Sequence, residues 1–543
     1  MSLGIFKVPE PVNEPIKGYL KGSTERASLK AMIEKFSKKT IEIPMVIGGK
    51  NVKTGKMGEC RAPHNHSLLL GKYHKGSAKE VERAIAAANK AHDDWSNWSW
   101  EERAAIFLKA ADLLAGPYRD VLNAATMLAQ SKVAFQAEID AACELIDFFR
   151  FNCAYARDIY EMQPDSAPGM WNRLEYRALE GFVFAVTPFN FTSIAANLPT
   201  APALMGNTVV WKPASTAVYS AHFIMQLLKE AGLPDGVVNM VLGSGSEIGN
   251  HVIKHPDLAG VHFTGSTAVF QSMWKTVGTN IANYKAYPRI VGETGGKDFI
   301  VVHKSAGVDE VCTAMVRGAF EYQGQKCSAA SRAYIPKGMW KKLQSKLVKE
   351  IATIKMGDVA DFTNLMGAVI DKSSFDKTKG YIDRANKSKN AQVIIGGGCD
   401  DSVGYFVEPT IILAKKADYE TMVEELFAPV LTVYVYDENK FEQTLRLCDK
   451  TSPYALTGAI ISKDRAAVKL AVKLLRNSAG NFYINDKPTG AVVGQQPFGG
   501  GRASGTNDKA GSLLNMIRWT SPRTIKETFV PPKGYQYPYM EED

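Results

Sequence analysis

Alternating apolar and amphipathic segments between residues 180 and 303 constrain the fold more than any other feature of the sequence. Short apolar runs predict strands, and longer segments with apolar residues at three- and four-residue spacing predict helices. The expected strands are residues 181–188, 206–214, 237–243, 259–265 and 298–303. The expected helices between them are residues 193–205, 217–232, 245–255 and 267–278. Such alternation predicts a parallel sheet with helices on both faces.

A second round of the same alternation follows Cys327. Its expected strands are residues 332–336, 391–397, 407–413, 429–436, 457–462 and 479–485. A chain of 543 residues is too long for one compact core. We therefore expect an α/β protein with two doubly wound parallel-sheet domains. A helical block is expected over residues 77–160 and a strand over 518–530.

Composition excludes several classes of function. The formal net charge of +9 is spread along the chain without a basic block that contains aromatics, so nucleic-acid binding is not expected. No stretch approaches the ~20 apolar residues of a membrane span. Residues 1–20 lack the apolar core of a signal peptide, and Glu10 and Glu14 argue against a transit peptide. Seven cysteines without a CxxC pair indicate a reducing compartment, no disulfide framework and no zinc.

Cys327 lies in a turn of polar and small residues, 321-EYQGQKCSAASRAYIP-336. Most cysteines in globular proteins are packed like small hydrophobic residues. Because Gly324, Gln325, Lys326 and Ser328 surround this one, its setting is unusual for a packing residue. The turn makes Cys327 a candidate nucleophile.

Two other polar residues are candidates for chemistry beside a pocket. Asn190 lies between Phe189 and Phe191, where its amide suits stabilisation of an oxyanion; a local Asx turn is the alternative. Glu293 precedes Gly295 in a glycine-rich loop, where a carboxylate with a raised pKa acts as a general base. An exposed loop glutamate is the alternative.

Four segments have features of a nucleotide site. The turns 243–249 and 263–270 place Gly and Ser at helix starts, which attract phosphate; ordinary turn chemistry is the alternative. Lys212 ends a buried strand, where it either bonds ribose hydroxyls or extends into solvent. Glu425 stands at the mouth of another strand, where it either accepts ribose hydroxyls or ends a helix. No GxGxxG motif is present.

Taken together, these segments resemble the aldehyde dehydrogenase superfamily over residues 45–525. The matching pieces are TPFNF (187–191), WKPAS (211–215), FTGST (263–267), ETGGK (293–297), GQKCSA (324–329), EELFAPV (424–430) and QQPFGG (495–500). The resemblance implies an aldehyde dehydrogenase-like fold: a Rossmann-like NAD domain, a catalytic thiol domain and a small β oligomerisation flap. In this family FTGST replaces GxGxxG.

The resemblance assigns catalytic roles to three residues. Cys327 is the nucleophile that attacks the aldehyde and forms first a thiohemiacetal and then a thioester. Asn190 and the backbone N–H of Cys327 hold the oxyanion. Glu293 activates the water that hydrolyses the thioester, whereas the neighbouring Lys326 is expected to point away.

The resemblance also implies NAD as the cofactor and no metal. Lys212 is expected at the adenosine ribose, Ser266 and Gly265 at the pyrophosphate, Glu425 at the nicotinamide ribose and Phe427 beside the ring. Thr187, Gly245 and Thr267 are further expected cofactor contacts. Many family members carry an acid that excludes a 2′-phosphate where this chain has Ser215, so some tolerance of NADP is expected.

Residues 140–156 and 486–511 are similar to the branch of the family that oxidises L-glutamate γ-semialdehyde to L-glutamate in proline degradation. In this branch Ser328 and the loop 489–494 hold the substrate, with the backbone N–H groups of Gly490 and Ala491 at its carboxylate. Phe191 and Phe498 enclose its aliphatic chain. Ala491 replaces a serine common in the branch, which predicts a weaker KM. Another semialdehyde such as succinic semialdehyde, a thiol esterase and a catalytically silent protein are the alternatives.

The expected domains follow from this resemblance. They are an N-terminal arm (1–44), the NAD domain (45–300, with a flap near 161–180), the catalytic domain (301–490) and a return to the NAD domain with the flap and tail (491–543). The expected partners are a small aldehyde, a second copy of the chain in a homodimer or larger homo-oligomer, and a separate proline dehydrogenase upstream. The expected location is the cytoplasm in a bacterium and the mitochondrial matrix in a eukaryote.

Overall fold

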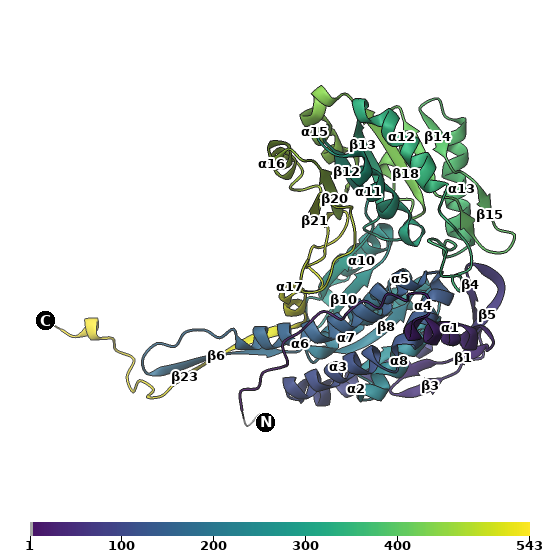
Figure 1. The fold of residues 1–543 in the computed structure, drawn as a ribbon. Coiled ribbons are helices and arrows are strands. Elements are labelled where there is room, and N and C mark those ends of the chain that lie inside the picture. The colour runs from purple at the N-terminus through teal and green to yellow at the C-terminus, as the bar shows by residue number, and fades with distance from the viewer. Residues whose placement is uncertain (1–3, 543) are drawn as a thin grey trace.

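Two lobes, each built on a seven-stranded sheet, make up the body of the molecule. The computed structural model describes residues 4–542, so the first three residues of the expected arm lie outside it. Figure 1 shows the lobe with the first sheet below and the lobe with the second sheet above. No helix among residues 4–542 is long and apolar enough to cross a membrane.

The first sheet has the strand order β11-β10-β7-β8-β9-β2-β3. Its strands are β2 (Met45–Ile47), β3 (Lys50–Val52), β7 (Phe182–Thr187), β8 (Thr208–Pro213), β9 (Val238–Met240), β10 (Leu258–Thr264) and β11 (Arg289–Glu293). The five strands β7 to β11 are parallel; β7 to β10 were predicted, the fifth expected strand, 298–303, belongs to the second sheet, and β2 and β3 add an antiparallel edge. The connecting helices are α7 (Thr192–Leu204), α8 (Val218–Ala231), α9 (Gly245–Val252) and α10 (Thr267–Thr279). The edge strand β11 was not predicted.

The second sheet has the strand order β14-β17-β18-β13-β12-β20-β21. Its strands are β12 (Asp298–Val302), β13 (Ala330–Pro336), β14 (Ala391–Ile395), β17 (Thr410–Ala414), β18 (Val430–Tyr436), β20 (Thr457–Ile461) and β21 (Asn481–Ile484). Only β14 runs antiparallel to its neighbour. The principal helices are α11 (Val308–Phe320), α12 (Lys337–Ile351), α13 (Lys372–Lys387), α15 (Phe441–Thr451) and α16 (Arg465–Leu474). This sheet begins at Asp298, inside the range expected for the first domain.

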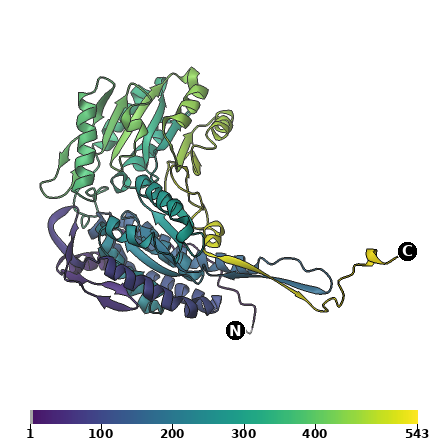
Figure 2. The same cartoon turned by 180° about the vertical axis from the view of Figure 1, so that it is seen from behind.

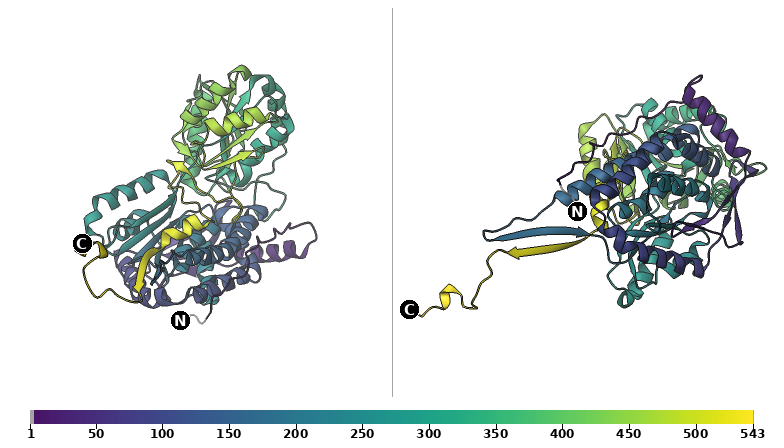
Figure 3. Two further views of the ribbon diagram at one scale, coloured as in Figure 1. Left: turned by 90° about the vertical axis from the view of Figure 1, so that its left-hand side faces the viewer. Right: turned by 90° about the horizontal axis from the view of Figure 1, so that it is seen from below.

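A block of helices packs against the first sheet (Figure 3). It consists of α2 (Ala78–Asn97), α3 (Trp100–Ala115), α4 (Arg119–Gln130), α5 (Ala134–Ala137) and α6 (Leu145–Glu161). A stretch of π-helix, Glu138–Glu144, lies between α5 and α6. Such insertions into an α-helix often occur at functional sites, and this one carries Glu138, which bonds to Arg119, and Asp140 and Glu144, which both accept from Ser193.

The chain ends in a long ribbon that leaves the body (Figures 1 and 2). It pairs β6 (Met170–Arg177) with β23 (Ser521–Thr528) in antiparallel register. Before β23 the chain returns to the first lobe, where the carbonyl of Trp519 accepts a hydrogen bond from Asn207 at 2.9 Å. At the other end, residues 4–23 precede α1 (Thr24–Ser37), and a small sheet is formed by β1 (Ile41–Ile43), β4 (Met57–Ala62) and β5 (Asn65–His74).

Candidate active site

A cavity of about 790 Å³ opens at the carboxyl ends of β7, β8, β10 and β11 and is closed on its other side by the second lobe. Ligand sites in parallel α/β sheets occur at these strand ends. Nine of the sequence-predicted residues line it: Thr187, Asn190, Lys212, Gly245, Gly265, Ser266, Cys327, Glu425 and Phe427. Residues more than 200 positions apart in the sequence therefore meet around one space.

The thiol of Cys327 is presented by a strained turn after α11. Tyr322 and Gln323 have positive φ angles of 50° and 53°, a conformation that costs energy for residues other than glycine. Gly324 follows with φ of 65°, where a Cβ atom would lie 2.3 Å from the carbonyl oxygen of Ala428. The Gln323 amide fixes the turn by donating to the carbonyls of Ser131 and Ala368, at 2.9 and 2.8 Å. As a result Cys327 is half-buried at the cavity wall.

The surroundings of Cys327 favour the protonated thiol in the free protein. Burial raises its pKa, and the neighbouring carboxyl groups of Asp298 and Glu293 raise it further. Lys326 does not offset them, because its ammonium group donates to Glu321 at 3.1 Å. Loss of the proton from Cys327 must therefore accompany ligand binding or the attack on the substrate.

Asn190 follows the end of β7 and lines the same cavity as Cys327. Its Nδ2 donates to the carbonyl of Gln325 at 3.1 Å, a residue far away in the sequence, so the side chain does not form a local Asx turn. An amide has a second N–H donor, and Asn190 lines the cavity. The backbone N–H of Cys327 donates to no acceptor among residues 4–542. These two donors beside the thiol form an arrangement that can stabilise an oxyanion.

Glu293 ends β11 and is half-buried, so it is not an exposed loop residue. Its Oε2 accepts a hydrogen bond from the backbone N–H of Gly500 at 2.9 Å. Two glycines enclose it, because a Cβ atom on Gly499 or Gly505 would lie about 3 Å from its oxygens. Burial raises the pKa of the Glu293 carboxyl well above its usual value. A carboxyl with a raised pKa is a stronger base than an ordinary glutamate and is suited to accept a proton from water.

The opposite part of the cavity suits a dinucleotide. α10 begins directly after Ser266, and α9 begins at Gly245, so two helix N-termini with free N–H groups open onto it. The ammonium group of Lys212 lies 4.0 Å from where a Cβ on Gly245 would be, and burial lowers its pKa to about 8. Glu425 accepts from the backbone N–H of Gly296 at 2.8 Å. The helix N–H groups and the Lys212 ammonium at one end of the cavity fit the pyrophosphate of a dinucleotide. The Glu425 carboxylate at the other end fits the hydroxyls of a ribose.

The remaining predicted cofactor residues lie at the edges of this space. Ser215 is half-buried and donates to the carbonyl of Gly243 at 3.3 Å. Thr267 lies on the first turn of α10, and its hydroxyl donates to Tyr454 of the second lobe at 3.4 Å. Phe427 has a positive φ of 60° and packs edge-on against Phe189, with ring centroids 5.8 Å apart. Neither Ser215 nor Thr267 lines the cavity itself.

None of the five predicted substrate residues, Phe191, Ser328, Gly490, Ala491 and Phe498, lines this cavity. The Ser328 side chain is buried, and its hydroxyl has no partner among the described residues. The backbone N–H groups of Gly490 and Ala491 likewise donate to no acceptor within residues 4–542. Phe498 is half-buried and is fixed by backbone pairing with Ala510. Unused donors on adjacent residues are typical of an anion-binding loop.

Sequence reasoning missed a buried charge cluster beside Phe191. The Lys132 ammonium lies 4.1 Å from the centre of the Phe191 ring and donates to Asp140 at 2.6 Å. Asp140 also accepts from the backbone of Thr192 at 3.0 Å. Glu144 accepts from the hydroxyl of Ser193 at 2.8 Å. Acidic residues in the apolar helix 136–160 were the available signal, because such residues are rarely buried without a partner.

Glu144 is the member of this cluster with the most unusual carboxyl. Burial, together with the nearby charge of Asp140, raises its pKa to about 8. Its charge also contributes to the raised pKa of Cys327, which indicates that the two groups are close. A half-buried carboxyl here is a candidate acceptor for a cationic group of a ligand.

Comparisons with known proteins agree with this geometry. The model of the aldehyde dehydrogenase family matches residues 51–525. The chain is 54% identical over 536 residues to a mitochondrial delta-1-pyrroline-5-carboxylate dehydrogenase of Dictyostelium discoideum, covering 98% of this chain and 96% of the relative. It is 47% identical over 530 residues to the mitochondrial human protein of that name, covering 97% and 94%.

Solved structures give the same result. The delta-pyrroline-5-carboxylate dehydrogenase of Mycobacterium tuberculosis bound with NAD is 52% identical and covers 100% of both chains with a TM-score of 0.96. The 1-pyrroline-5-carboxylate dehydrogenase from Thermus with bound NAD is 31% identical with a TM-score of 0.90, covering 96% of this chain and 100% of that one.

Proposed function

The chain belongs to the aldehyde dehydrogenase family, and we propose that it oxidises L-glutamate γ-semialdehyde, the open-chain form of pyrroline-5-carboxylate, to L-glutamate. Relatives that share half of its residues over nearly their full length carry this activity in their names. The observation that carries the proposal is the grouping of Cys327, the Asn190 amide and the free backbone N–H of Cys327 at one wall of a dinucleotide-shaped cavity.

The first step is attack by the Cys327 sulfur on the aldehyde carbon. The thiol gives up its proton to solvent water, the sulfur bonds to the carbonyl carbon, and the carbonyl π bond breaks to place its electrons on the oxygen of a thiohemiacetal. Negative charge that develops on the carbonyl oxygen is received by the second N–H of Asn190 and by the backbone N–H of Cys327. Because both donors are fixed before the reaction, they stabilise the charge without reorganisation.

NAD, when bound, supplies the hydride acceptor. Lys212, Gly265, Ser266 and Glu425 would hold it, since these residues line the part of the cavity that fits pyrophosphate and ribose. Loss of hydride from the substrate carbon leaves a thioester on Cys327. Glu293 then removes a proton from a water molecule, which attacks the thioester and releases glutamate. The raised pKa of the Glu293 carboxyl favours its acceptance of this proton.

The substrate differs from a simple aldehyde by its α-carboxylate and α-ammonium groups. We assign the carboxylate to the N–H groups of Gly490 and Ala491 and to the hydroxyl of Ser328, all three of which are unused. We assign the ammonium to Glu144, the half-buried carboxyl next to Phe191. Phe191 and Phe498 enclose the chain between them.

We also propose an oligomeric state and a cellular location for this chain. We propose a homodimer or larger homo-oligomer in which the ribbon of β6 and β23 contacts a second subunit, because Trp171 on this ribbon and Phe529 beyond it expose apolar surface. The relatives from Dictyostelium and human are named mitochondrial. We propose the mitochondrial matrix for this chain if its source is a eukaryote and the cytoplasm if it is a bacterium.

A steady-state assay tests the function. NADH formation is followed at 340 nm with L-glutamate γ-semialdehyde, succinic semialdehyde and propionaldehyde, with Cys327→Ala as the control. We expect the highest kcat/KM for glutamate semialdehyde and no NADH from the variant. A preference for succinic semialdehyde would reassign the substrate, and ester hydrolysis without NADH formation would indicate a thiol esterase.

A further inference from the structure

Asn13, in the N-terminal arm of residues 4–23, connects this arm to the loop 489–494. Its Nδ2 donates to the carbonyl of Val493 and to Oδ2 of Asp147 on α6, both at 2.8 Å. Its Oδ1 accepts from Nε2 of Gln495 at 2.9 Å. Both N–H donors and the carbonyl oxygen of the Asn13 amide are therefore in use, and all three bonds span more than 130 residues of sequence.

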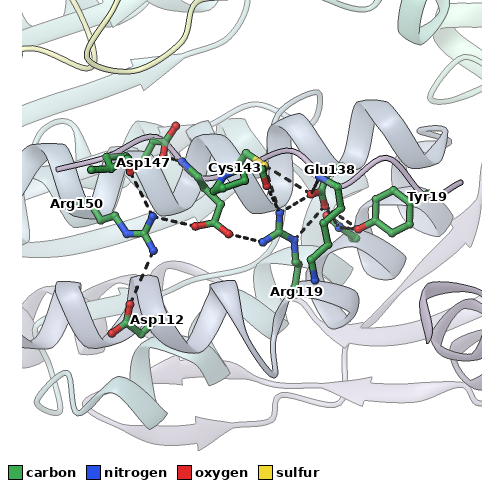
Figure 4. Close-up of polar contacts among 12 residues, drawn as sticks. Tyr19, Asp112, Arg119, Glu138, Cys143, Asp147 and Arg150 are labelled. Atoms are coloured by element: carbon green, nitrogen blue, oxygen red, sulfur yellow. Dashed lines mark hydrogen bonds and ion pairs between the residues drawn. The ribbon is translucent and has the colours of Figure 1, made fainter. Parts of the chain in front are cut away.

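The arm itself is held firmly against the helical block (Figure 4). The backbone N–H of Glu14 donates to Oδ1 of Asp147 at 2.7 Å, and its carboxylate pairs with Arg119 and Arg150 at 2.5 and 2.9 Å. Further along, the hydroxyl of Tyr19 donates to Glu138 at 2.7 Å. These hydrogen bonds and ion pairs fix the position of the arm on the helical block. Asn13 therefore has a defined position next to the loop 489–494.

Other contacts hold the ends of the loop and close its last turn, where the backbone N–H of Val492 donates to Oε1 of Gln496 at 2.9 Å and the Val492 carbonyl accepts from the N–H groups of Gln495 and Gln496 at 3.0 Å. At its start the hydroxyl of Tyr483 donates to the carbonyl of Thr489 at 3.0 Å. At its end Gly494 has φ of +82°, and a Cβ atom there would lie 2.1 Å from the ring of Phe151 on α6. Between these two points lie the free N–H groups of Gly490 and Ala491. The bonds of Asn13 to Val493 and Gln495 attach the end of the loop, after Gly490 and Ala491, to the N-terminal arm.

We propose that Asn13 is a positioning residue for the substrate: it pre-organises the loop so that Gly490 and Ala491 present their N–H groups to the α-carboxylate. The inference rests on the proposed function, because it assumes a substrate with that carboxylate. Without Asn13 the loop has more conformations in the free protein, and substrate binding must order it at a cost in affinity. Hydride and thiol chemistry at Cys327 does not involve this loop.

The consequence is a selective loss of affinity. Asn13→Ala should raise KM for L-glutamate γ-semialdehyde about three- to tenfold, the effect of losing one or two neutral hydrogen bonds. kcat/KM for propionaldehyde, which has no α-carboxylate, should stay within about twofold of the wild type. Lys17→Ala is the matched control, because Lys17 lies on the same arm but only its backbone bonds to Glu138, at 2.8 Å.

A binding experiment separates this inference from the proposed function. Calorimetric titration of the full-length protein with L-glutamate, the product, requires no turnover, and titration with NAD serves as the reference. We expect Asn13→Ala to weaken glutamate binding and to leave NAD binding unchanged. Gln495→Ala removes one of the three Asn13 bonds from the loop side and leaves the bonds of Asn13 to Val493 and Asp147, and the arm, in place. The variant with both substitutions, Asn13→Ala and Gln495→Ala, should lose less glutamate affinity than the two single losses added together, because both substitutions remove the same bond.

The outcomes are distinct. Equal glutamate affinity in the wild type, Asn13→Ala and Gln495→Ala would overturn the inference while leaving the proposed substrate intact. Equal losses for glutamate and NAD would show a general structural effect and would also overturn it. A wild type that does not bind glutamate would overturn the proposed substrate, and this inference with it. If Asn13→Ala does not fold, the Gln495→Ala result decides.

Discussion

The carboxylate of Glu293 accepts a hydrogen bond from the backbone N–H of Gly500, with 2.9 Å between Oε2 and the nitrogen. This bond ties the end of β11 in the first lobe to the segment that returns from the second lobe. Burial raises the pKa of the same carboxyl. The charge of Glu293 contributes to the raised pKa of Cys327, which indicates that the two groups are close, and the bond from Gly500 leaves Oε1 of Glu293 for a water molecule.

Glu293→Gln should separate the two halves of the reaction. Glutamine keeps an oxygen that can accept from Gly500 but cannot take a proton from water. We therefore expect a burst of NADH of about one equivalent per active site, followed by a steady state slowed about 10²- to 10⁴-fold. Stopped-flow absorbance at 340 nm measures both phases. Glu310→Gln, an exposed position on α11, is the control, and loss of the burst in Glu293→Gln would contradict the assignment.

The pH dependence of turnover should carry the signature of Glu293. A general base works in its deprotonated form, and the pKa of this one is raised. The rate of thioester hydrolysis should therefore fall as pH decreases through a pKa well above the ordinary glutamate value of 4.5. The acidic limb of the kcat profile measures this pKa. In Glu293→Gln the limb should disappear, and a limb that persists unchanged would assign it to another group.

Ser215 should set the tolerance of NADP. The chain has a neutral hydroxyl at the position where family members exclude a 2′-phosphate with an acid. We expect measurable wild-type activity with NADP. Ser215→Glu should lower kcat/KM for NADP more than about tenfold, equivalent to ~1.4 kcal/mol, while changing that for NAD less than about threefold. Ser215→Ala is the control. A wild type without NADP activity would refute the tolerance.

Binding of the substrate or of glutamate should release a proton from the carboxyl of Glu144. Its pKa is raised to about 8, so at pH 7 most of it is protonated in the free protein. An incoming α-ammonium favours the charged carboxylate, so glutamate binding at pH 7 should release a proton and should strengthen as pH rises from 6 to 8. Calorimetry in buffers of different ionisation enthalpy measures the release. Glu144→Gln should abolish the release, and proton uptake in the wild type would contradict it.

The sequence predicted most strands of the two sheets and many of the residues that line the cavity. It did not predict the backbone conformation of the segments that connect them. Strands β7 and β8 were readable because nearly every residue in them is buried and apolar. The edge strand β11 was missed because only two of its five residues are large and apolar. A central strand of a parallel sheet has a continuous run of apolar residues. β11 lacks this run because it lies at the edge of the sheet and ends in Gly292 and Glu293.

Long-range features were beyond the sequence for a different reason. The left-handed backbone of Tyr322 and Gln323 is imposed by bonds to Ser131 and Ala368, which no local pattern encodes. The N-terminal arm read as a polar surface segment because its partners are distant helices. The charge cluster of Lys132, Asp140 and Glu144 is visible only once α5, the π-helix and α7 are packed together.

The buried pair of Arg119 and Glu138 should dominate the stability of the arm. Arg119 donates to both oxygens of Glu138, which also accepts from Tyr19 and Asn123. Burial alone would raise the pKa of Glu138, but the hydrogen bonds and charge of Arg119 lower it on balance. The carboxylate therefore stabilises the fold fully above its unfolded pKa of about 4.5, and this contribution is lost as pH falls through the lower folded value.

Glu138→Ala tests this directly. It leaves the guanidinium of Arg119 buried with Glu14 as its remaining carboxylate, so we expect the free energy of unfolding to fall by about 3–5 kcal/mol at pH 7. Glu34→Ala removes an exposed pair with Lys38 on α1 and should leave the free energy of unfolding close to that of the wild type. Urea denaturation of both variants at pH 7 measures the difference. Because protonation of Glu138 also weakens the pair, the gap between wild type and Glu138→Ala should narrow below about pH 4; a gap that does not depend on pH would assign the loss to packing instead.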